Sequence, residues 1–230
     1  MSGPLRVLVV AAHPDDEVLG CGGTVAMHAS AGDEVNTVIV AEGATSRAES
    51  RAETDAGEVS ALAAAAAAAA EVLGARPPRM LGLPDNRLDS LNLLEVIKPI
   101  EAIVEELSPA VVYTHFNGDL NVDHRIVFQA VATACRPMPG SPVKALYCFE
   151  TPSSSEWGAE ALGLRFQPNR FRDISAVLET KMEALRRYES EMRPFPHARS
   201  YQLVESLARV RGGSVGVEAA EGFQVIREVV

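Results

Sequence analysis

The sequence has little cysteine, no excess of positive charge and no apolar run long enough to cross a membrane. Its three cysteines, Cys21, Cys135 and Cys148, lie far apart and form no CxxC pair, so neither a disulfide framework nor a structural zinc knuckle is indicated. The net charge of −10 argues against a protein that binds nucleic acid or anionic membranes, because both functions need basic patches. The alanine-rich run at 61–70 is too short and too weakly apolar to span a bilayer. We therefore expect no nucleic-acid partner and no membrane insertion.

The sequence also lacks the marks of a secreted or multidomain protein. Residues 1–4 lead directly into the first predicted strand without a basic segment or a cleavage site, so we expect a cytoplasmic location. A hydrophobic fraction of 47% and a charged fraction of 23% are typical of a globular chain, and 230 residues suffice for one large α/β domain. We find no internal repeat and no long linker. We therefore predict a single domain over residues 1–230, in which the helices and tail of residues 173–230 complete the pocket. Assembly into a homo-oligomer is left open by the sequence.

Predicted strands and helices alternate along the chain. Each apolar run that reads as a strand is followed by a stretch with apolar residues at helical spacing. This alternation predicts a three-layer α/β fold, in which a mostly parallel, Rossmann-like sheet carries helices on both faces. The predicted strands are residues 7–10, 35–40, 80–83, 111–114 and 143–149, and the predicted helices are residues 18–31, 51–73, 93–107, a segment ending near 135, 175–187 and 201–211.

The remaining segments complete the periphery of this predicted fold. The tail at 222–230 alternates in polarity and predicts an edge strand. His28, on the first predicted helix, is expected to face solvent. The stretch 151–172, which contains Trp157, has two interpretations: it forms a lid or substrate wall, or it is a peripheral flap.

The first predicted strand runs into a dense group of ionisable residues. The strand is followed by His13, Pro14, Asp15, Asp16 and Glu17. In an open α/β sheet, ligands bind at the carboxyl ends of the strands. Three carboxylates and an imidazole so close together would repel and desolvate one another unless a cation or solvent compensates. A metal site explains the group, and the alternative is a helix N-terminus enriched in acids.

A second polar stretch, residues 115–125, follows the fourth predicted strand. If that strand returns beside the first, the loops after both strands flank the same crevice. His13 and Asp16 would then face His124, and two imidazoles with one carboxylate leave an open position, which is typical of a catalytic zinc site. Asp15 would act as general base toward the metal-bound water, and Asp123 would support the site as a cap or as the partner of a ligand.

Several segments together carry a resemblance to a known family. They are AHPDDE after the first predicted strand, LPDNRLD after the third, GDLNVDHR after the fourth, and PHARS and AEGF near the C-terminus. In combination they resemble the PIG-L/LmbE family of zinc-dependent deacetylases, which act on N-acetylglucosamine-type substrates. The resemblance implies metal binding by the two histidines and Asp16, with Asp15 as the base. Substrate contacts are implied for Arg47 or Arg51 and for Asp85, whose loop has the alternative of being a simple turn.

One position departs from the family pattern. Several members carry a histidine three residues before the third ligand, where it is proposed to stabilise the oxyanion or to protonate the leaving amine. This sequence has Asn121 there. An amide can donate a hydrogen bond to the substrate but cannot deliver a proton. The acid would therefore be protonated Asp15, His197 in the C-terminal segment, or His115.

The reaction implied by the resemblance is hydrolysis of an acetamide, with metal-bound water as nucleophile and Zn²⁺ as cofactor. Fe²⁺ or another divalent metal also suits two histidines and a carboxylate. The substrate would be a small N-acetylated sugar or its conjugate. The alternatives are an amidase on a thiol–sugar conjugate or another N-acyl substrate, and a non-catalytic metal- or ligand-binding protein. A nucleotide-dependent oxidoreductase is disfavoured, because an acidic loop stands where GxGxxG should follow the first strand.

Overall fold

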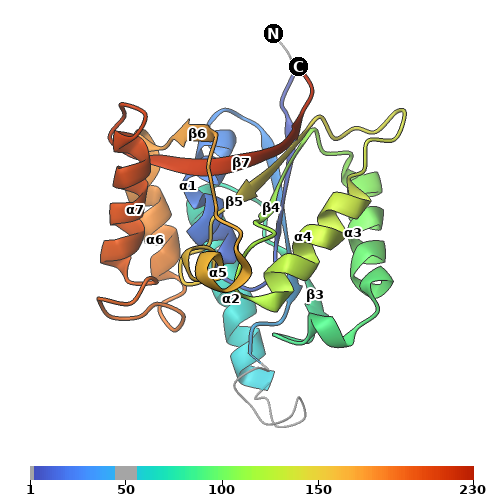
Figure 1. Ribbon diagram of the computed structural model, residues 1–230, viewed down its shortest axis with the longest axis horizontal. Coiled ribbons are helices and arrows are strands. Elements are labelled where there is room, and N and C mark those ends of the chain that lie inside the picture. Colours follow the sequence, from blue (N-terminus) through green and yellow to red (C-terminus); the bar gives the residue numbers. More distant parts are fainter. Residues whose placement is uncertain (1–2, 45–55) are drawn as a thin grey trace.

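A seven-stranded sheet forms the centre of the protein (Figure 1). The computed structural model describes residues 3–44 and 56–230. The strands are β1 (Arg6–Ala11), β2 (Glu34–Ala41), β3 (Arg79–Leu83), β4 (Val111–His115), β5 (Ala145–Phe149), β6 (Arg170–Asp173) and β7 (Ala220–Glu228). Their order is β3-β2-β1-β4-β5-β7-β6. The first five strands in this order are parallel, whereas β7 is antiparallel to both β5 and β6.

Helices cover both faces of the sheet. They are α1 (Asp16–Ser30), α2 (Ala56–Leu73), α3 (Leu93–Leu107), α4 (Val122–Ala134), α5 (Ser155–Leu162), α6 (Leu178–Arg186) and α7 (Tyr201–Gly213), with short 3-10 turns at η3 (Leu88–Ser90) and η4 (Ser175–Val177). Val7 and Val9 of β1 pack with α1, α2 and α6, whereas Leu8 and Val10 pack with α3 and α4. This division follows from the alternation of side chains along a strand. The predicted three-layer, mostly parallel fold is confirmed.

The order of the strands brings two distant loops together. Strands β2 and β3 are added on one side of β1, and β4 then pairs on the other side, with Val10 opposite Thr114. The loops after β1 and β4 therefore leave the same edge of the sheet at adjacent points. This is the switch point at which open α/β sheets bind ligands.

Helix α1 is broken at Cys21, whose φ of −147° and ψ of 22° are not helical. The second half of the helix therefore begins with N–H groups that need partners. The N–H groups of residues 23 and 24 donate to the buried carboxylate of Glu221, from β7, at 2.9 and 2.7 Å. Lys181 of α6 pairs with that carboxylate at 2.6 Å and also donates to the Leu19 carbonyl at 2.9 Å. Strand β7 thus holds the second half of α1, and α6 holds the end of the first half, which begins with Asp16 and Glu17.

The predicted edge strand at the C-terminus is wrong. Strand β7 pairs with β5 on one side and with β6 on the other, so it lies inside the sheet. Its first four residues are buried; three of them are small or apolar, and the fourth, Glu221, is buried because Lys181 and two backbone N–H groups bind its carboxylate. The edge strand on this side of the sheet is β6, most of which falls in the stretch at 151–172 that the sequence left open as a lid, a wall or a flap.

The prediction that His28 faces solvent is also wrong. Its ring is buried, with Nδ1 2.7 Å from Asp33 Oδ2 and Nε2 3.1 Å from the Tyr113 hydroxyl. Burial lowers the pKa of His28, although the hydrogen bond to Asp33 opposes this effect. A histidine near the end of a helix thus fills a polar position between the helix and the sheet.

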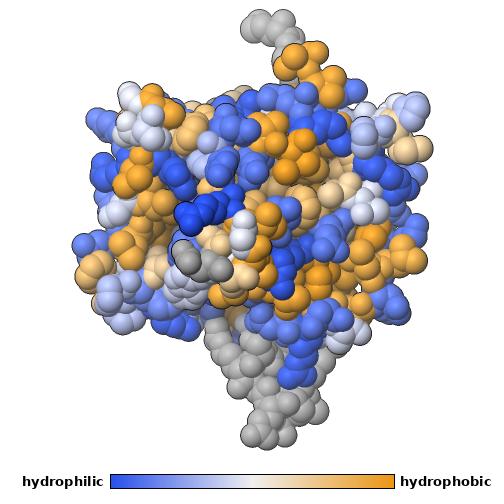
Figure 2. Space-filling view, in the orientation of Figure 1, coloured by the Kyte–Doolittle hydropathy of each residue, from blue (hydrophilic) through white to orange (hydrophobic). Residues whose placement is uncertain are grey.

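Among the residues that the structure describes, no helix is long and apolar enough to cross a membrane. Figure 2 shows hydrophilic and hydrophobic side chains interleaved over one face of the molecule. The three cysteines are buried and free.

Candidate functional site

Two imidazoles and a carboxylate meet at the switch point. His13 follows β1, Asp16 begins α1, and His124 lies in the first turn of α4. Asp16 Oδ2 is 3.2 Å from His13 Nδ1 and 3.3 Å from His124 Nε2. Ligand atoms from the three residues all lie within 4.8 Å of one another. The two polar stretches singled out in the sequence therefore converge on one point.

Carboxylates also hold the outer nitrogen of each imidazole. His124 Nδ1 is 2.8 Å from Asp119 Oδ2, and His13 Nε2 is 3.1 Å from both Asp85 Oδ1 and Asp123 Oδ2. If the inner nitrogens bound a metal, each ring would keep its proton on the outer nitrogen, where these carboxylates accept it. Histidines that bind metals are commonly oriented by carboxylates in this way.

Four buried carboxylates make this cluster strongly negative; they are Asp16, Asp85, Asp119 and Asp123, each at most 2% exposed. Burial disfavours a charged imidazole, yet Asp16 and Asp119 raise the pKa of His124 to about 9. Contacts with carboxylates likewise raise the pKa of His13 well above its usual range against the effect of burial. The cluster thus draws protons onto its imidazoles, and a divalent cation would satisfy the same carboxylates. The donor set, two imidazoles and a carboxylate, fits zinc and ferrous iron.

Asp15 lies beside this cluster in a strained backbone conformation. Its φ is 103°, a value that residues other than glycine rarely adopt and that occurs mainly at functional sites. The side chain is buried, and Oδ2 accepts a hydrogen bond from Arg199 Nη1 at 2.9 Å. Burial raises the pKa of Asp15 well above its usual range, although Arg199 acts in the opposite direction. A carboxyl group of this kind suits proton transfer near neutral pH.

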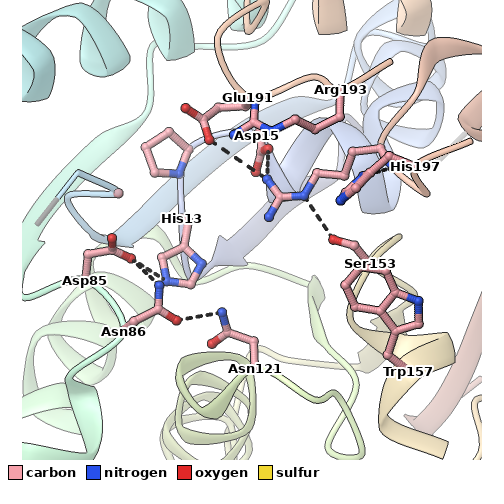
Figure 3. Close-up of a pocket in the computed structure, with 13 residues that line it drawn as sticks. His13, Asp15, Asp85, Asn86, Asn121, Ser153, Trp157, Glu191, Arg193 and His197 are labelled. Atoms are coloured by element: carbon pink, nitrogen blue, oxygen red, sulfur yellow. Dashed lines mark hydrogen bonds and ion pairs between the residues drawn. The ribbon is translucent and has the colours of Figure 1, made fainter. Parts of the chain in front are cut away.

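Two residues of the cluster, His13 and Asp85, line a cavity of about 320 Å³ (Figure 3). In Figure 3, His13 and Asp85 lie on one side of this cavity, and Trp157 and His197 lie on the other. The described residues that line it are His13, Pro14, Asp15, Gly43, Asp85, Asn86, Asn121, Ser153, Trp157, Glu191, Arg193, His197 and Arg199. Segments from both ends of the chain therefore form its walls.

Asn121 and Asp123 stabilise the start of α4. Asn121 Oδ1 accepts from the Asp123 N–H at 2.8 Å, and its Nδ2 donates to Asn86 Oδ1, also at 2.8 Å. Asp123 accepts from the N–H groups of Asn86 and Leu88 at 2.7 and 3.1 Å. The loop after β3 is thereby attached to the loop after β4, and Asn121 faces the cavity with an amide that already has two partners.

The three alternatives for the acid are placed differently. Asp15 and His197 line the cavity. His115 is fully buried, and its Nε2 accepts from the Ala12 N–H at 2.8 Å. Burial and the neighbouring His124 lower the pKa of His115 to about 4. A neutral ring that is bonded to the backbone does not fit the role of proton donor to a substrate.

His197 and Arg199 come from the loop between α6 and α7. The Arg199 N–H donates to His197 Nδ1 at 3.0 Å, so the neutral ring carries its proton on Nε2. The guanidinium of Arg199 donates through Nε to Ser153 Oγ at 3.0 Å and through Nη1 to Asp15. Sequence analysis missed this arginine, although it belongs to the PHARS segment, because nothing local shows that this loop returns to β1. Arg47 and Arg51 lie outside the residues that the structure describes.

Comparison with known proteins shows which family this chain resembles. The family model described as "PIG-L: GlcNAc-PI de-N-acetylase" matches residues 8–135, which include both polar stretches. The chain is 30% identical over 190 residues to the uncharacterized deacetylase YaiS of Escherichia coli K12, covering 80% of this chain and 90% of that protein. It is 27% identical over 234 residues to diacetylchitobiose deacetylase of Thermococcus kodakarensis, covering 96% of this chain and 83% of that one.

The fold is also similar to solved structures. That of GalB, the 4-carboxy-2-hydroxymuconate hydratase from Pseudomonas putida KT2440, matches with a TM-score of 0.77 at 24% identity, over 98% of both chains. Because a hydratase shares the fold, the fold by itself does not determine the reaction. The family model spans more than half of the sequence, and it contains the residues that converge at the switch point. The chain belongs to the PIG-L family, the family of GlcNAc-PI de-N-acetylase.

Proposed function

We propose that this protein is a metal-dependent hydrolase that removes the acetyl group from an N-acetylated amino sugar or its conjugate. The observation that carries the proposal is the meeting of His13, Asp16 and His124, with a carboxylate behind each imidazole, beside the buried Asp15 in an open cavity. Three protein ligands with room for a fourth are typical of catalytic rather than structural metal sites. The deacetylases among the relatives, one of them named for diacetylchitobiose, support an N-acetyl sugar as substrate.

The proposed cofactor is Zn²⁺, held by the two histidines and Asp16. Fe²⁺ suits the same donors and is the alternative. When bound, such a metal supplies a Lewis acid that lowers the pKa of water and stabilises negative charge on a carbonyl oxygen. The carboxylates on the outer nitrogens support this assignment, because they fix the orientation of both rings.

Asp15 and His197 are the proposed catalytic groups. Asp15 takes a proton from the water that attacks the acetyl carbon. Asp15, once protonated, delivers that proton to the sugar nitrogen as the C–N bond breaks, so that the products are acetate and the free amino sugar. His197, whose neutral ring carries its proton on Nε2, donates a hydrogen bond to the substrate during this step. The proposed substrate contacts are Asp85, Asn121 and Arg47 or Arg51, and Asp123 has a supporting role.

We also infer that residues 1–230 act as one domain. The sheet includes strands from β1 to β7, and the loop between α6 and α7 lines the same cavity as the loop after β1. Both observations support the prediction that residues 173–230 complete the pocket. The cytoplasmic location stays a prediction from the sequence.

Release of acetate tests the proposed reaction. Protein loaded with Zn²⁺ is assayed for acetate and free amine on N-acetylglucosamine, diacetylchitobiose and glycosides of N-acetylglucosamine. We expect turnover with about one metal ion per chain, and a loss of about 100-fold or more for Asp15→Asn, because general bases contribute on this scale. Asp89→Asn, an exposed carboxylate on η3 outside the cavity lining, is the matched control. No release from any of these sugars, or full activity of Asp15→Asn, overturns the proposal.

A further inference from the structure

The end of the cavity opposite the metal cluster has a feature that hydrolysis of the acetamide does not use. Trp157, the only tryptophan in the sequence, lies on α5 and lines the cavity. It is 46% exposed, whereas Asp15 is 1% exposed. Trp157 is also the one large apolar side chain among the described lining residues. The cavity therefore has a buried reactive end and an open aromatic end.

The position of Trp157 is fixed by the packing of α5. The neighbouring Gly158 lies so close to the loop at 118–120 that a Cβ there would collide with a backbone carbonyl oxygen. Ser155, at the start of the helix, donates through Oγ to Asp119, the carboxylate that orients His124. The indole and the His197 ring meet at 80°, with their centroids 5.8 Å apart. These contacts make Trp157 part of a rigid wall.

A sugar ring has the chemistry that such a wall can recognise. One face of a pyranose presents C–H groups and is apolar, and the negative face of an indole attracts them. Within residues 3–44 and 56–230, the Trp157 indole N–H makes no hydrogen bond, so it is available to donate to a hydroxyl. The polar side chains of Ser153, Glu191 and Arg193 line the cavity with it and suit the hydroxyls at the rim of the ring.

We propose that Trp157 forms a second sugar subsite, which binds the ring attached to the reacting N-acetylated sugar. This inference rests on the proposed function for one point, that the acetamide occupies the buried end beside Asp15. A substrate held in that way extends toward the open end, where its next ring meets the indole. The protein therefore prefers a disaccharide or a longer glycoside to a free monosaccharide.

Sugar binding to the zinc-loaded Asp15→Asn protein tests this subsite without turnover. The probes are N,N′-diacetylchitobiose and N-acetylglucosamine, with affinities measured by isothermal titration calorimetry and by tryptophan fluorescence, which reports on Trp157 alone. We expect the disaccharide to bind about tenfold more tightly, which corresponds to about 1.4 kcal/mol, and to change the fluorescence. Adding Trp157→Ala should abolish the preference and leave monosaccharide binding unaltered, and Trp157→Phe should keep part of it. Leu162→Ala, on the same helix, is the control, because Leu162 is 42% exposed and is not among the lining residues.

The outcomes separate this proposal from the proposed reaction. Equal affinity of the parent protein for both sugars, a preference that survives both Trp157 substitutions, or binding without a fluorescence change overturns the subsite. Failure to bind either sugar also overturns it. Acetate release together with an unchanged preference in Trp157→Ala refutes the subsite alone, whereas binding at Trp157 without acetate release by the wild type refutes the deacetylase alone.

Discussion

Replacing Arg199 with alanine removes the contact that holds the proposed base. Arg199 Nη1 is 2.9 Å from Asp15 Oδ2, and the two side chains are 31% and 2% exposed. A hydrogen bond between charged groups contributes about 1.5–3 kcal/mol, so kcat should fall about 10- to 100-fold. Because Arg199 acts through Asp15, KM should change much less than kcat. Arg199→Lys should recover only part of the activity, since an ammonium group cannot bond Asp15 and Ser153 in the same fork.

The assay is steady-state acetate release over a range of pH, with the zinc content measured for each variant. Burial raises the pKa of Asp15 and Arg199 lowers it, so removal of the guanidinium should move the acidic limb of the profile to higher pH. Guanidinium ion added to the Arg199→Ala protein should restore part of kcat. Arg209→Ala, which removes an exposed ion pair with Glu205 on α7, should have no effect. A variant that keeps most of the wild-type kcat, or that changes KM alone, refutes this reasoning.

Three other predictions concern the metal ligands and the C-terminal support. Without a metal, the pKa of His124 is raised to about 9, so zinc must displace a proton from this ring and should bind more weakly as the pH falls below that value. Calorimetry in buffers of different ionisation enthalpy measures the protons released on zinc binding. Zinc binding that releases no proton contradicts the prediction. Asp119→Asn removes the carboxylate from His124 Nδ1 and should weaken zinc binding about 10- to 100-fold in a chelator competition, whereas unchanged affinity argues against its orienting role. Lys181→Met removes the cation beside the buried carboxylate of Glu221, which keeps only its two backbone hydrogen bonds, and should lower the free energy of unfolding by about 3–5 kcal/mol. Urea denaturation measures that loss, and adding Glu221→Gln to the Lys181→Met protein should recover part of the stability. A Lys181→Met protein as stable as the wild type contradicts the prediction.

Local patterns were sufficient for most of the architecture. The helix predicted at 93–107 coincides with α3, because its start and end are encoded nearby: Glu95 accepts from the Asn92 N–H at 2.9 Å, and Ser108 ends the helix in a left-handed conformation. The parallel strands were recognisable because burial on both faces requires a continuous apolar run. The position of β7 was predicted wrongly, because a strand's neighbours are chosen by segments far away in the chain.

The candidate site was accessible to sequence analysis only in part. The segments AHPDDE and GDLNVDHR could be singled out because each places a histidine close to carboxylates within a few residues. Their convergence followed from a topological rule about where a parallel sheet reverses. Arg199 was assigned no role, and the stretch with Trp157 was left open between a substrate wall and a flap, because a loop arginine and an exposed tryptophan acquire a function only from the side chains they meet.

The sequence by itself determined most strands and helices along the chain, though not α5 and β6, and it also determined the family and the residue types at the expected metal site. Each of these depends on local spacing and side-chain chemistry. Tertiary structure alone decided which carboxylate holds which nitrogen, that His115 is tied to the backbone while His197 lines the cavity, and that Arg199 reaches Asp15. Those contacts join residues far apart in the chain. They follow from how the layers pack and how deeply each group is buried, which no local pattern records.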